Sequence, residues 1–351
     1  MSRLTEVRQW VQEEKRYLWI VICLVLFHTG TSILDNFTRP LESAASVAEE
    51  SLVIKEEQML KLFREDASLW LLFVFLGLFV FLAMLVGLYW GIRFLWLKRK
   101  GKFSIRWRLP EQKILWSIRD VFRLTVIVVL FSYVIEILQF VLFRFVPEHI
   151  SEGIRLLTGT LATQVIALFL IFRLVRLRKG QMFSHLGLSA KAFSRNIVFG
   201  LQSYVSLLPV LFLALFVSIV IAEVFRLNPP PQPIQELFKE GTPQKIFLTA
   251  LVLVTLVGPV VEEIFFRGFL YSALKMKWGK GWAVFASGFL FALLHANWVA
   301  LLPIALLGCA LAYIYELTGS LVASITIHVL HNALVMTVFL LAAHFSRLAG
   351  I

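Results

Sequence analysis

The chain has 351 residues, of which 59% are hydrophobic and 16% charged, and its mean hydropathy is +0.82. This composition is too apolar for a water-soluble globular protein. The formal net charge of +12 does not indicate a nucleic-acid partner, because the basic residues fall in short segments between apolar runs, as the positive-inside rule expects. We therefore predict an integral, multi-pass membrane protein whose surroundings are the lipid bilayer.

Apolar runs that we interpret as membrane spans follow one another along the chain. They cover residues 17–27, 69–97, 121–146, 156–175, 197–225, 246–271, 281–297, 299–316 and 319–343. The predicted fold class is an all-α, polytopic transmembrane helical bundle of about eight to nine spans. The sequence HANW, residues 295–298, leaves little room for the turn between the seventh and eighth spans.

Charge in the connecting segments predicts the topology. Three basic clusters, at 98–108, 173–179 and 275–280, fall on one side of the membrane if the N-terminus is cytoplasmic. The acid-rich loop 35–66 and the proline-rich segment 228–233 then fall outside. We expect the plasma (inner) membrane of a bacterium, with the N-terminus in the cytoplasm.

Two adjacent carboxylates interrupt the apolar stretch GPVVEEIFFRGFL, residues 258–270. On a helix Glu263 and Arg267 are four residues apart and can form an ion pair, whereas Glu262 is rotated by roughly 100°. Pro259 cannot donate to the carbonyl of Thr255, which predicts a kink in the helix there. One reading is a general base beside a neutralised neighbour, and the other is a structural ion pair; this stretch alone leaves both open.

Further polar residues lie in the last two motif-bearing spans. Phe291 and His295 share a helical face, as do His328 and Asn332. Each pair taken alone is typical of a structural contact between helices. Together with the glutamates they form the elements of a hydrolase, and we expect Glu262, His295 and His328 to converge on one cavity open to the cytoplasm. No serine or cysteine has a nucleophile-like context, which disfavours an acyl-enzyme.

The motifs EEIFFR, FALLH and HVLHN fit the patterns EExxxR, FxxxH and HxxxN in order. The chain thereby resembles the CPBP family of intramembrane proteases, which includes the type II CAAX prenyl endopeptidases and the bacteriocin-processing or immunity-associated Abi proteins. The resemblance covers about 245–343, and HLGL at 185–188 is similar to it as well. We accordingly divide the chain into an N-terminal transmembrane region of unknown role, 1–180, and a protease core, 181–351, with motifs at 262–267, 291–295 and 328–332.

The resemblance also implies roles for individual residues. Glu262 would activate the hydrolytic water with His295, and Glu263 and Arg267 would support the first motif. His328 and Asn332 would bind the developing oxyanion. The implied activity is that of a membrane-embedded endopeptidase acting on a peptide or protein within or at the membrane, with CAAX-type processing of a lipidated peptide as one form of it.

The cofactor remains open at this point. Glu262, His295 and His328 could bind a divalent metal such as zinc, but HExxH, which places two histidines beside a glutamate base, is absent from the sequence. A metal-independent glutamate–histidine site is the reading that we favour. Two rival functions are a non-catalytic scaffold or immunity protein with the same fold, and a transporter. Internal repeats would support a transporter, and we find no such repeats in the sequence.

Overall fold

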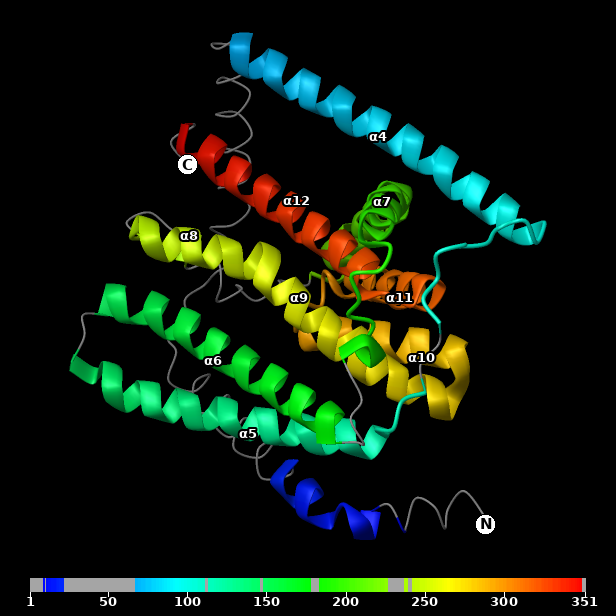
Figure 1. Ribbon diagram of the computed structural model, residues 1–351. Coiled ribbons are helices and arrows are strands. Elements are labelled where there is room, and N and C mark those ends of the chain that lie inside the picture. The colour runs from blue at the N-terminus through cyan, green and yellow to red at the C-terminus, as the bar shows by residue number, and fades with distance from the viewer. Residues whose placement is uncertain are drawn as a thin grey trace.

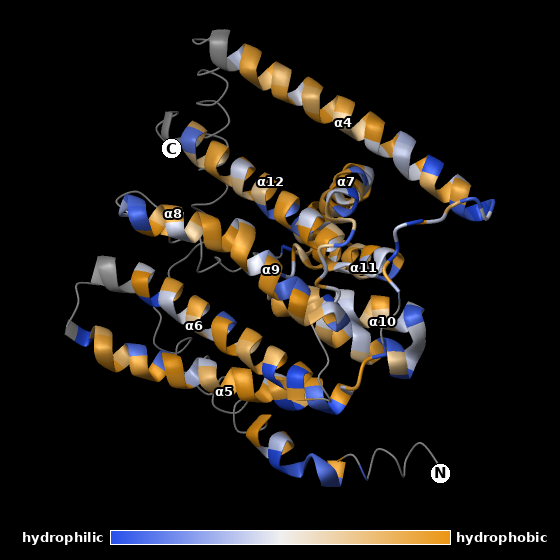
Figure 2. Ribbon diagram, viewed as in Figure 1, coloured by the Kyte–Doolittle hydropathy of each residue, from blue (hydrophilic) through white to orange (hydrophobic). Residues whose placement is uncertain are grey.

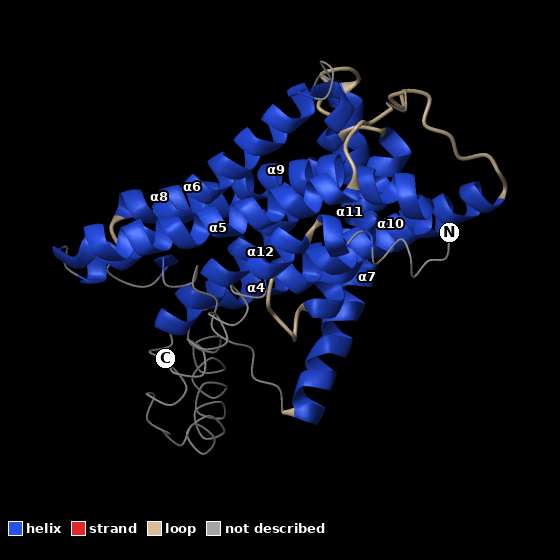
Figure 3. Cartoon of the chain, turned by 90° about the horizontal axis from the view of Figure 1, so that it is seen from below, coloured by secondary structure: helices blue, strands red, loops and turns tan. Residues whose placement is uncertain are grey.

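The computed structural model describes residues 9, 11–21, 67–110, 113–145, 148–177, 183–226, 237–238 and 242–348. Within them the chain is helical with connecting turns and contains no strand, which confirms the all-α prediction (Figure 3). The α-helices are α4 (Ala67–Arg99), α5 (Ile118–Leu142), α6 (Glu148–Leu177), α7 (Phe193–Phe225), α8 (Gln244–Val252), α9 (Gly258–Glu263), α10 (Ser272–Leu294), α11 (Leu301–Thr318) and α12 (Leu321–Leu348). Shorter elements are the 3-10 turns η1 (Phe143–Phe145) and η2 (Phe183–Leu186) and the π-helical segments η4 (Leu253–Val257) and η5 (Ile264–Tyr271).

Seven helical runs in this part of the chain are long and apolar enough to cross a membrane. They coincide with the expected spans from 69–97 onward, except that 246–271 and 281–297 are joined in one run, Gln244–Leu294. Gly279 interrupts this run with φ 76° and ψ 172°, a conformation that favours glycine. The chain folds back there, because Ser287 donates to the carbonyl of Phe266 at 3.2 Å. The first expected span, 17–27, extends past the described residues, and the loops 35–66 and 228–233 lie outside them.

Helices pack both against their neighbours in the sequence and against helices far away in it. α5 and α6 lie side by side, α8 lies next to α6, and α12 contacts α9, α11 and α7 (Figures 1 and 3). α4 packs against α7, where Pro209 cannot donate to the carbonyl of Val205. Gly87 of α4 faces this carbonyl so closely that a Cβ there would lie 2.2 Å from the oxygen. Helix α4 can therefore approach α7 only through a glycine.

The division of the chain at residue 180 stays a prediction, and hydrophobic contacts cross it. Trp116 stacks on Phe269 with ring centroids 5.7 Å apart, and its Nε1 donates to the Phe269 carbonyl at 3.0 Å. Val175 near the end of α6 belongs to the same buried cluster. The segments before residue 180 thus help to build the core around η5.

Two of the three basic clusters meet at one end of the helices, where hydrophilic residues interrupt the apolar surfaces (Figure 2). Glu316 near the end of α11 accepts ion pairs from Arg108 at 3.3 Å, from Lys275 at 2.7 Å and from Lys280 at 2.8 Å. Val175, within the second basic cluster, belongs to the same hydrophobic cluster as Ile114. The placement of all three basic clusters on one side of the membrane stays a prediction.

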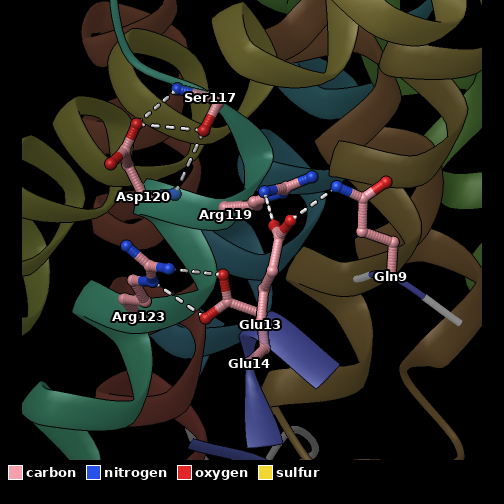
Figure 4. A network of polar contacts seen from close by, with 7 residues as sticks. All are labelled: Gln9, Glu13, Glu14, Ser117, Arg119, Asp120 and Arg123. Atoms are coloured by element: carbon pink, nitrogen blue, oxygen red, sulfur yellow. Dashed lines mark hydrogen bonds and ion pairs between the residues drawn. The ribbon is translucent and has the colours of Figure 1, made fainter. Parts of the chain in front are cut away.

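The N-terminal helical segment 11–21 docks on the start of α5 (Figure 4). Glu14 has no exposed surface and accepts two hydrogen bonds from Arg123, from Nε at 2.8 Å and from Nη2 at 2.7 Å. Glu13 pairs with Arg119 in a more exposed setting. This end of α5 is itself fixed by a capping box, in which Ser117 and Asp120 exchange hydrogen bonds. The segment is thus held by a bidentate pair on a rigid helix start.

We predict that Glu14→Ala weakens the docking of segment 11–21 far more than Glu13→Ala. Losing the buried, charge-assisted bonds of Glu14 should cost about 1–3 kcal/mol, whereas an exposed pair such as Glu13–Arg119 contributes about 0–1 kcal/mol. Hydrogen exchange of the amides in 11–21 measures the difference. Equal exchange rates in the two variants would mean that the bidentate pair does not hold the segment.

Candidate active site

The two glutamates lie in a short α-helical segment between two π-helical segments. α9 ends at Glu263, η4 precedes it and η5 follows it. The expected irregularity at Pro259 is present as η4, which contains Thr255, the residue whose carbonyl loses its donor. π-helical turns inside α-helices occur frequently at functional sites, because they shift the direction in which side chains point. Both glutamates therefore lie in a short α-helical segment whose backbone hydrogen-bond pattern changes on either side.

Glu263 is completely buried and holds two partners with one oxygen. Its Oε1 lies 2.7 Å from Nη1 of Arg267, which is the predicted ion pair between residues four apart. The same oxygen lies 3.0 Å from Nδ1 of His328 on α12. The carboxylate therefore fixes both the guanidinium and the imidazole.

Arg267 is also completely buried, and its other contacts come from α10 and α11. Its guanidinium carbon lies 4.6 Å from the ring centroid of Phe291, and Nη2 donates to the Gly308 carbonyl at 3.2 Å. The carbonyl can come this close because Gly308 packs against Gly288, where a Cβ on Gly308 would lie 2.8 Å from the Gly288 Cα. The ion pair is thus enclosed by three helical elements.

Glu262 differs from its neighbour in exposure and partners. Its side chain is 35% exposed, and its Oε2 lies 3.8 Å from Nε2 of His328. The imidazole of His328 therefore stands between the carboxylates, with one nitrogen on Glu263 and the other facing Glu262. Of the two acids, Glu262 is the more exposed, although its Oε2 is buried and has no hydrogen-bond partner among the described residues.

His295 is the C-cap residue of α10, and the ring of Phe291 contacts both His295 and His328. Nδ1 of His295 is 2.7 Å from the Phe291 carbonyl, so this nitrogen carries a hydrogen and Nε2 faces away from the helix end. The ring centroids of His295 and Phe291 are 4.5 Å apart, and those of Phe291 and His328 are 5.4 Å apart. Phe291 therefore contacts both histidines, and their convergence with Glu262 on one cavity stays a prediction.

The tight turn after His295 is possible because of two local features. Ala296 has a positive φ of 48°, and the side-chain oxygen of Asn297 accepts a hydrogen bond from the Ala300 amide at 3.0 Å. This backbone conformation and this hydrogen bond let α11 begin at Leu301, six residues after His295. The HANW segment thus provides the turn between the seventh and eighth expected spans.

Asn332 and His331 contact other elements. Nδ2 of Asn332 donates to the Val254 carbonyl in η4 at 2.9 Å and so joins α12 to the segment before the glutamates. His331, which could share the face of His328 by spacing, instead has its Nδ1 3.5 Å from the hydroxyl of Tyr204 on α7. The HxxxN motif therefore places one residue at Glu263 and the other at η4.

One polar residue near this site was missed in the sequence. A Cβ on Gly258 would lie 3.8 Å from Nε2 of Gln164 on α6 and 3.8 Å from Oε1 of Glu262. Gln164 is thus close to the accessible glutamate. Its polar side chain within the apolar run 156–175 was the signal that could have identified it. The residues that resemble the protease family begin only after this run.

The residues that could bind a metal ion by their chemistry are Glu262, His295 and His328. Among the described residues no group of three or more histidine, cysteine, aspartate or glutamate side chains is arranged to hold a metal ion. The part played by a metal is not tested by this arrangement, and the metal-independent site stays a prediction.

Comparisons with known proteins agree with the motifs. Residues 244–334, which contain all three motifs, match the family described as type II CAAX prenyl endopeptidase Rce1-like. A protein of Bacillus subtilis (strain 168) with the name "Putative membrane peptidase YdiL" is 30% identical over 86 residues, which make up 24% of this chain and 35% of that protein. The chain thus matches about a third of the length of this relative. No solved structure matches the chain. The resemblance to membrane proteases of the CAAX type is confirmed for this segment.

We predict that Arg267→Ala lowers the free energy of unfolding by about 3–5 kcal/mol, because Glu263 would stay buried without its counter-ion. The double variant Glu263→Gln/Arg267→Met should lose less, since it leaves no unpaired charge inside the protein. Thermal unfolding in detergent compares the two. Equal losses would show that packing, and not charge pairing, accounts for the effect of Arg267.

Proposed function

We propose that the chain is an intramembrane endopeptidase that hydrolyses a peptide bond with water activated by Glu262. The observation that carries the proposal is the contrast between the two carboxylates. Glu263 is buried and locked to Arg267 and His328. Glu262 is 35% exposed, and its Oε2, a buried acceptor with no hydrogen-bond partner among the described residues, lies 3.8 Å from the second nitrogen of the same imidazole. A water molecule beside these two atoms would hydrogen-bond to both.

In the proposed reaction Glu262 takes a proton from the water, and the water oxygen bonds to the carbonyl carbon of the peptide. The C–N bond then breaks, and Glu262 passes its proton to the leaving nitrogen. His328 donates its Nδ1 hydrogen to Glu263, so its Nε2 is directed at the water. Arg267 acts through Glu263 and positions the imidazole.

We assign the oxyanion to donors on α12, following the family resemblance. An amide nitrogen carries two hydrogens, so Asn332 can hold Val254 with one and donate the other to the oxyanion. His295 is proposed to assist from the end of α10, where its ring contacts Phe291. Such preorganised donors stabilise the charge that develops in the transition state.

The substrate class follows from the surroundings of the site and from the family match. Glu262 lies within a helical run long and apolar enough to cross a membrane, which favours a peptide embedded in the bilayer or held at its surface. The matching family is described by cleavage of CAAX prenyl proteins, and we propose processing of a lipidated or membrane-embedded peptide. A scaffold or immunity protein with this fold is the alternative that an assay decides.

We further propose that the basic end of the helices faces the cytoplasm of a bacterium. Arg108 of the first basic cluster and Lys275 of the third meet there at Glu316, and segment 11–21 docks on the start of α5. Excess lysine and arginine on cytoplasmic loops is the general rule for such proteins. The relative named as a membrane peptidase is bacterial, which supports the plasma membrane.

We predict that Glu262→Gln is folded and inactive. Removing a general base typically lowers the rate by about 10²–10⁴-fold, whereas the partly exposed side chain contributes little to stability. The measurement is cleavage of a membrane-peptide library by the purified chain in proteoliposomes, with products identified by mass spectrometry. Glu136→Gln, which neutralises an exposed acid of α5, is the matched control and should keep full activity. Full cleavage by Glu262→Gln would refute the proposed role, and no cleavage by the native chain would favour the scaffold.

The topology predicts opposite labelling of two loops. In a background in which Cys23 and Cys309 are replaced by serine, Lys102→Cys should react with a membrane-impermeant maleimide only from the cytoplasmic side. Ser51→Cys in the acid-rich loop should react only from outside. Reaction of both from the same side would contradict the assigned orientation.

A further inference from the structure

The side of helix α6 that packs toward the glutamate-bearing run carries one polar residue among apolar ones. These residues recur every three or four positions, which places them on one face of an α-helix. In the first half of α6 they join the hydrophobic cluster that contains Leu253, and in the second half the cluster that contains Phe269. The members of this face are Leu157, Leu161, Gln164, Leu168, Ile171 and Val175.

Gln164 lies close to Glu262, with Gly258 beside both. A Cβ on Gly258 would lie 3.8 Å from Nε2 of Gln164 and 3.8 Å from Oε1 of Glu262, so these two atoms are separated by no more than twice this distance. A water molecule or a peptide group, with its hydrogen bonds, can span such a gap. Helix α6 also contacts α9, the segment in which Glu262 lies. The amide of Gln164 is therefore within reach of a ligand that is bound at Glu262.

Both side chains contain a buried oxygen that needs a hydrogen bond. Oε1 of Gln164 and Oε2 of Glu262 are buried acceptors with no hydrogen-bond partner among the described residues. A buried acceptor whose hydrogen bond is not made costs free energy. A leucine at position 164 would avoid this cost and would complete the apolar face of α6. Since such departures from local packing rules are expected at functional sites, the glutamine is better explained by a ligand than by packing.

We propose that Gln164 binds the main chain of the peptide substrate next to Glu262. A carboxamide has a donor and an acceptor side by side, and one residue of an extended peptide presents an N–H and a C=O in the same direction. Oε1 of Gln164 accepts the substrate N–H, and Nε2 donates to the substrate carbonyl. This contact rests on the proposed function, because it supplies a substrate-binding group to the same site. It also brings α6 into the site, although α6 precedes the segment 244–334 that matches the protease family.

Gln164→Leu separates substrate binding from packing, because leucine fits the apolar face of α6 and makes no hydrogen bond. The unfolding temperature in detergent should stay unchanged or rise, since the variant no longer buries an amide. Gln202→Leu, the same substitution at an exposed position of α7, is the matched control. A glutamine that merely held the helices together would lower the unfolding temperature when replaced, and that result would overturn the proposal.

Peptide binding is measured with chains that carry Glu262→Gln, so that the peptide is retained and not cleaved. The probe is the library of membrane peptides, and the retained peptides are quantified by mass spectrometry. Adding Gln164→Leu should lower retention by about tenfold, through the loss of two hydrogen bonds. Adding Gln202→Leu should change retention by less than about twofold. Equal retention with and without Gln164→Leu would overturn the proposal.

The kinetics of a cleaved peptide locate the contact within the reaction. Gln164→Leu alone should raise KM by about tenfold and leave kcat unchanged, as expected for a contact that is equally strong in the ground state and the transition state. A fall in kcat with unchanged KM would place the amide at the hydrolytic water. That result would contradict binding of the peptide main chain.

The same measurements separate the binding site from the endopeptidase activity. Retention that depends on Gln164, without any cleavage by the native chain, would refute the peptidase and support the peptide-binding site. Normal cleavage, with a KM and a retention that do not depend on Gln164, would refute the binding site alone. A chain that neither retains nor cleaves any peptide would refute both.

Discussion

Burial of a guanidinium and a carboxylate inside a membrane protein is the constraint to which the surrounding helices conform. An ion without partners in such a medium costs several kcal/mol. Arg267 and Glu263, both without exposed surface, meet this demand through each other, the Gly308 carbonyl and His328. The bond from Arg267 to the Gly308 carbonyl requires the close packing of Gly308 on Gly288. The relative positions of η5, α11 and α12 are therefore set by polar contacts as well as by apolar packing.

The same constraint separates the roles of two residues that are neighbours in the chain. Because successive helical residues point in different directions, only one of the glutamates can face the arginine. Glu263 is fully buried and makes the structural contacts of the pair. Glu262 keeps 35% of its side chain exposed and lies next to the imidazole that Glu263 orients. Reactive groups need such support from residues that do not themselves react. Under the proposed function, the structural reading applies to Glu263 and the catalytic reading to Glu262.

Sequence reasoning predicted those features that depend on one helix at a time. Hydropathy located the spans, because each must be apolar along its length, and spacing by four located the Glu263–Arg267 pair. Contacts between helices were harder. Counting by motif joined His295 to Glu262, and this convergence stays a prediction. The contact of one ring, Phe291, with both His295 and His328 depends on rotamers that no spacing rule contains. Gln164 and Glu316 were missed because their partners lie on other helices, more than thirty residues away along the chain.

The contacts of the buried pair also bear on the order in which the chain matures. Glu263 and Arg267 leave the ribosome before Gly308, and Gly308 leaves before His328. The pair therefore leaves the ribosome before its carbonyl and imidazole partners do. Only α12 supplies the nitrogen that stands between the two carboxylates. Under the proposed function, a nascent chain that ends before residue 328 lacks the imidazole of the hydrolytic centre and would not yet cleave its substrate.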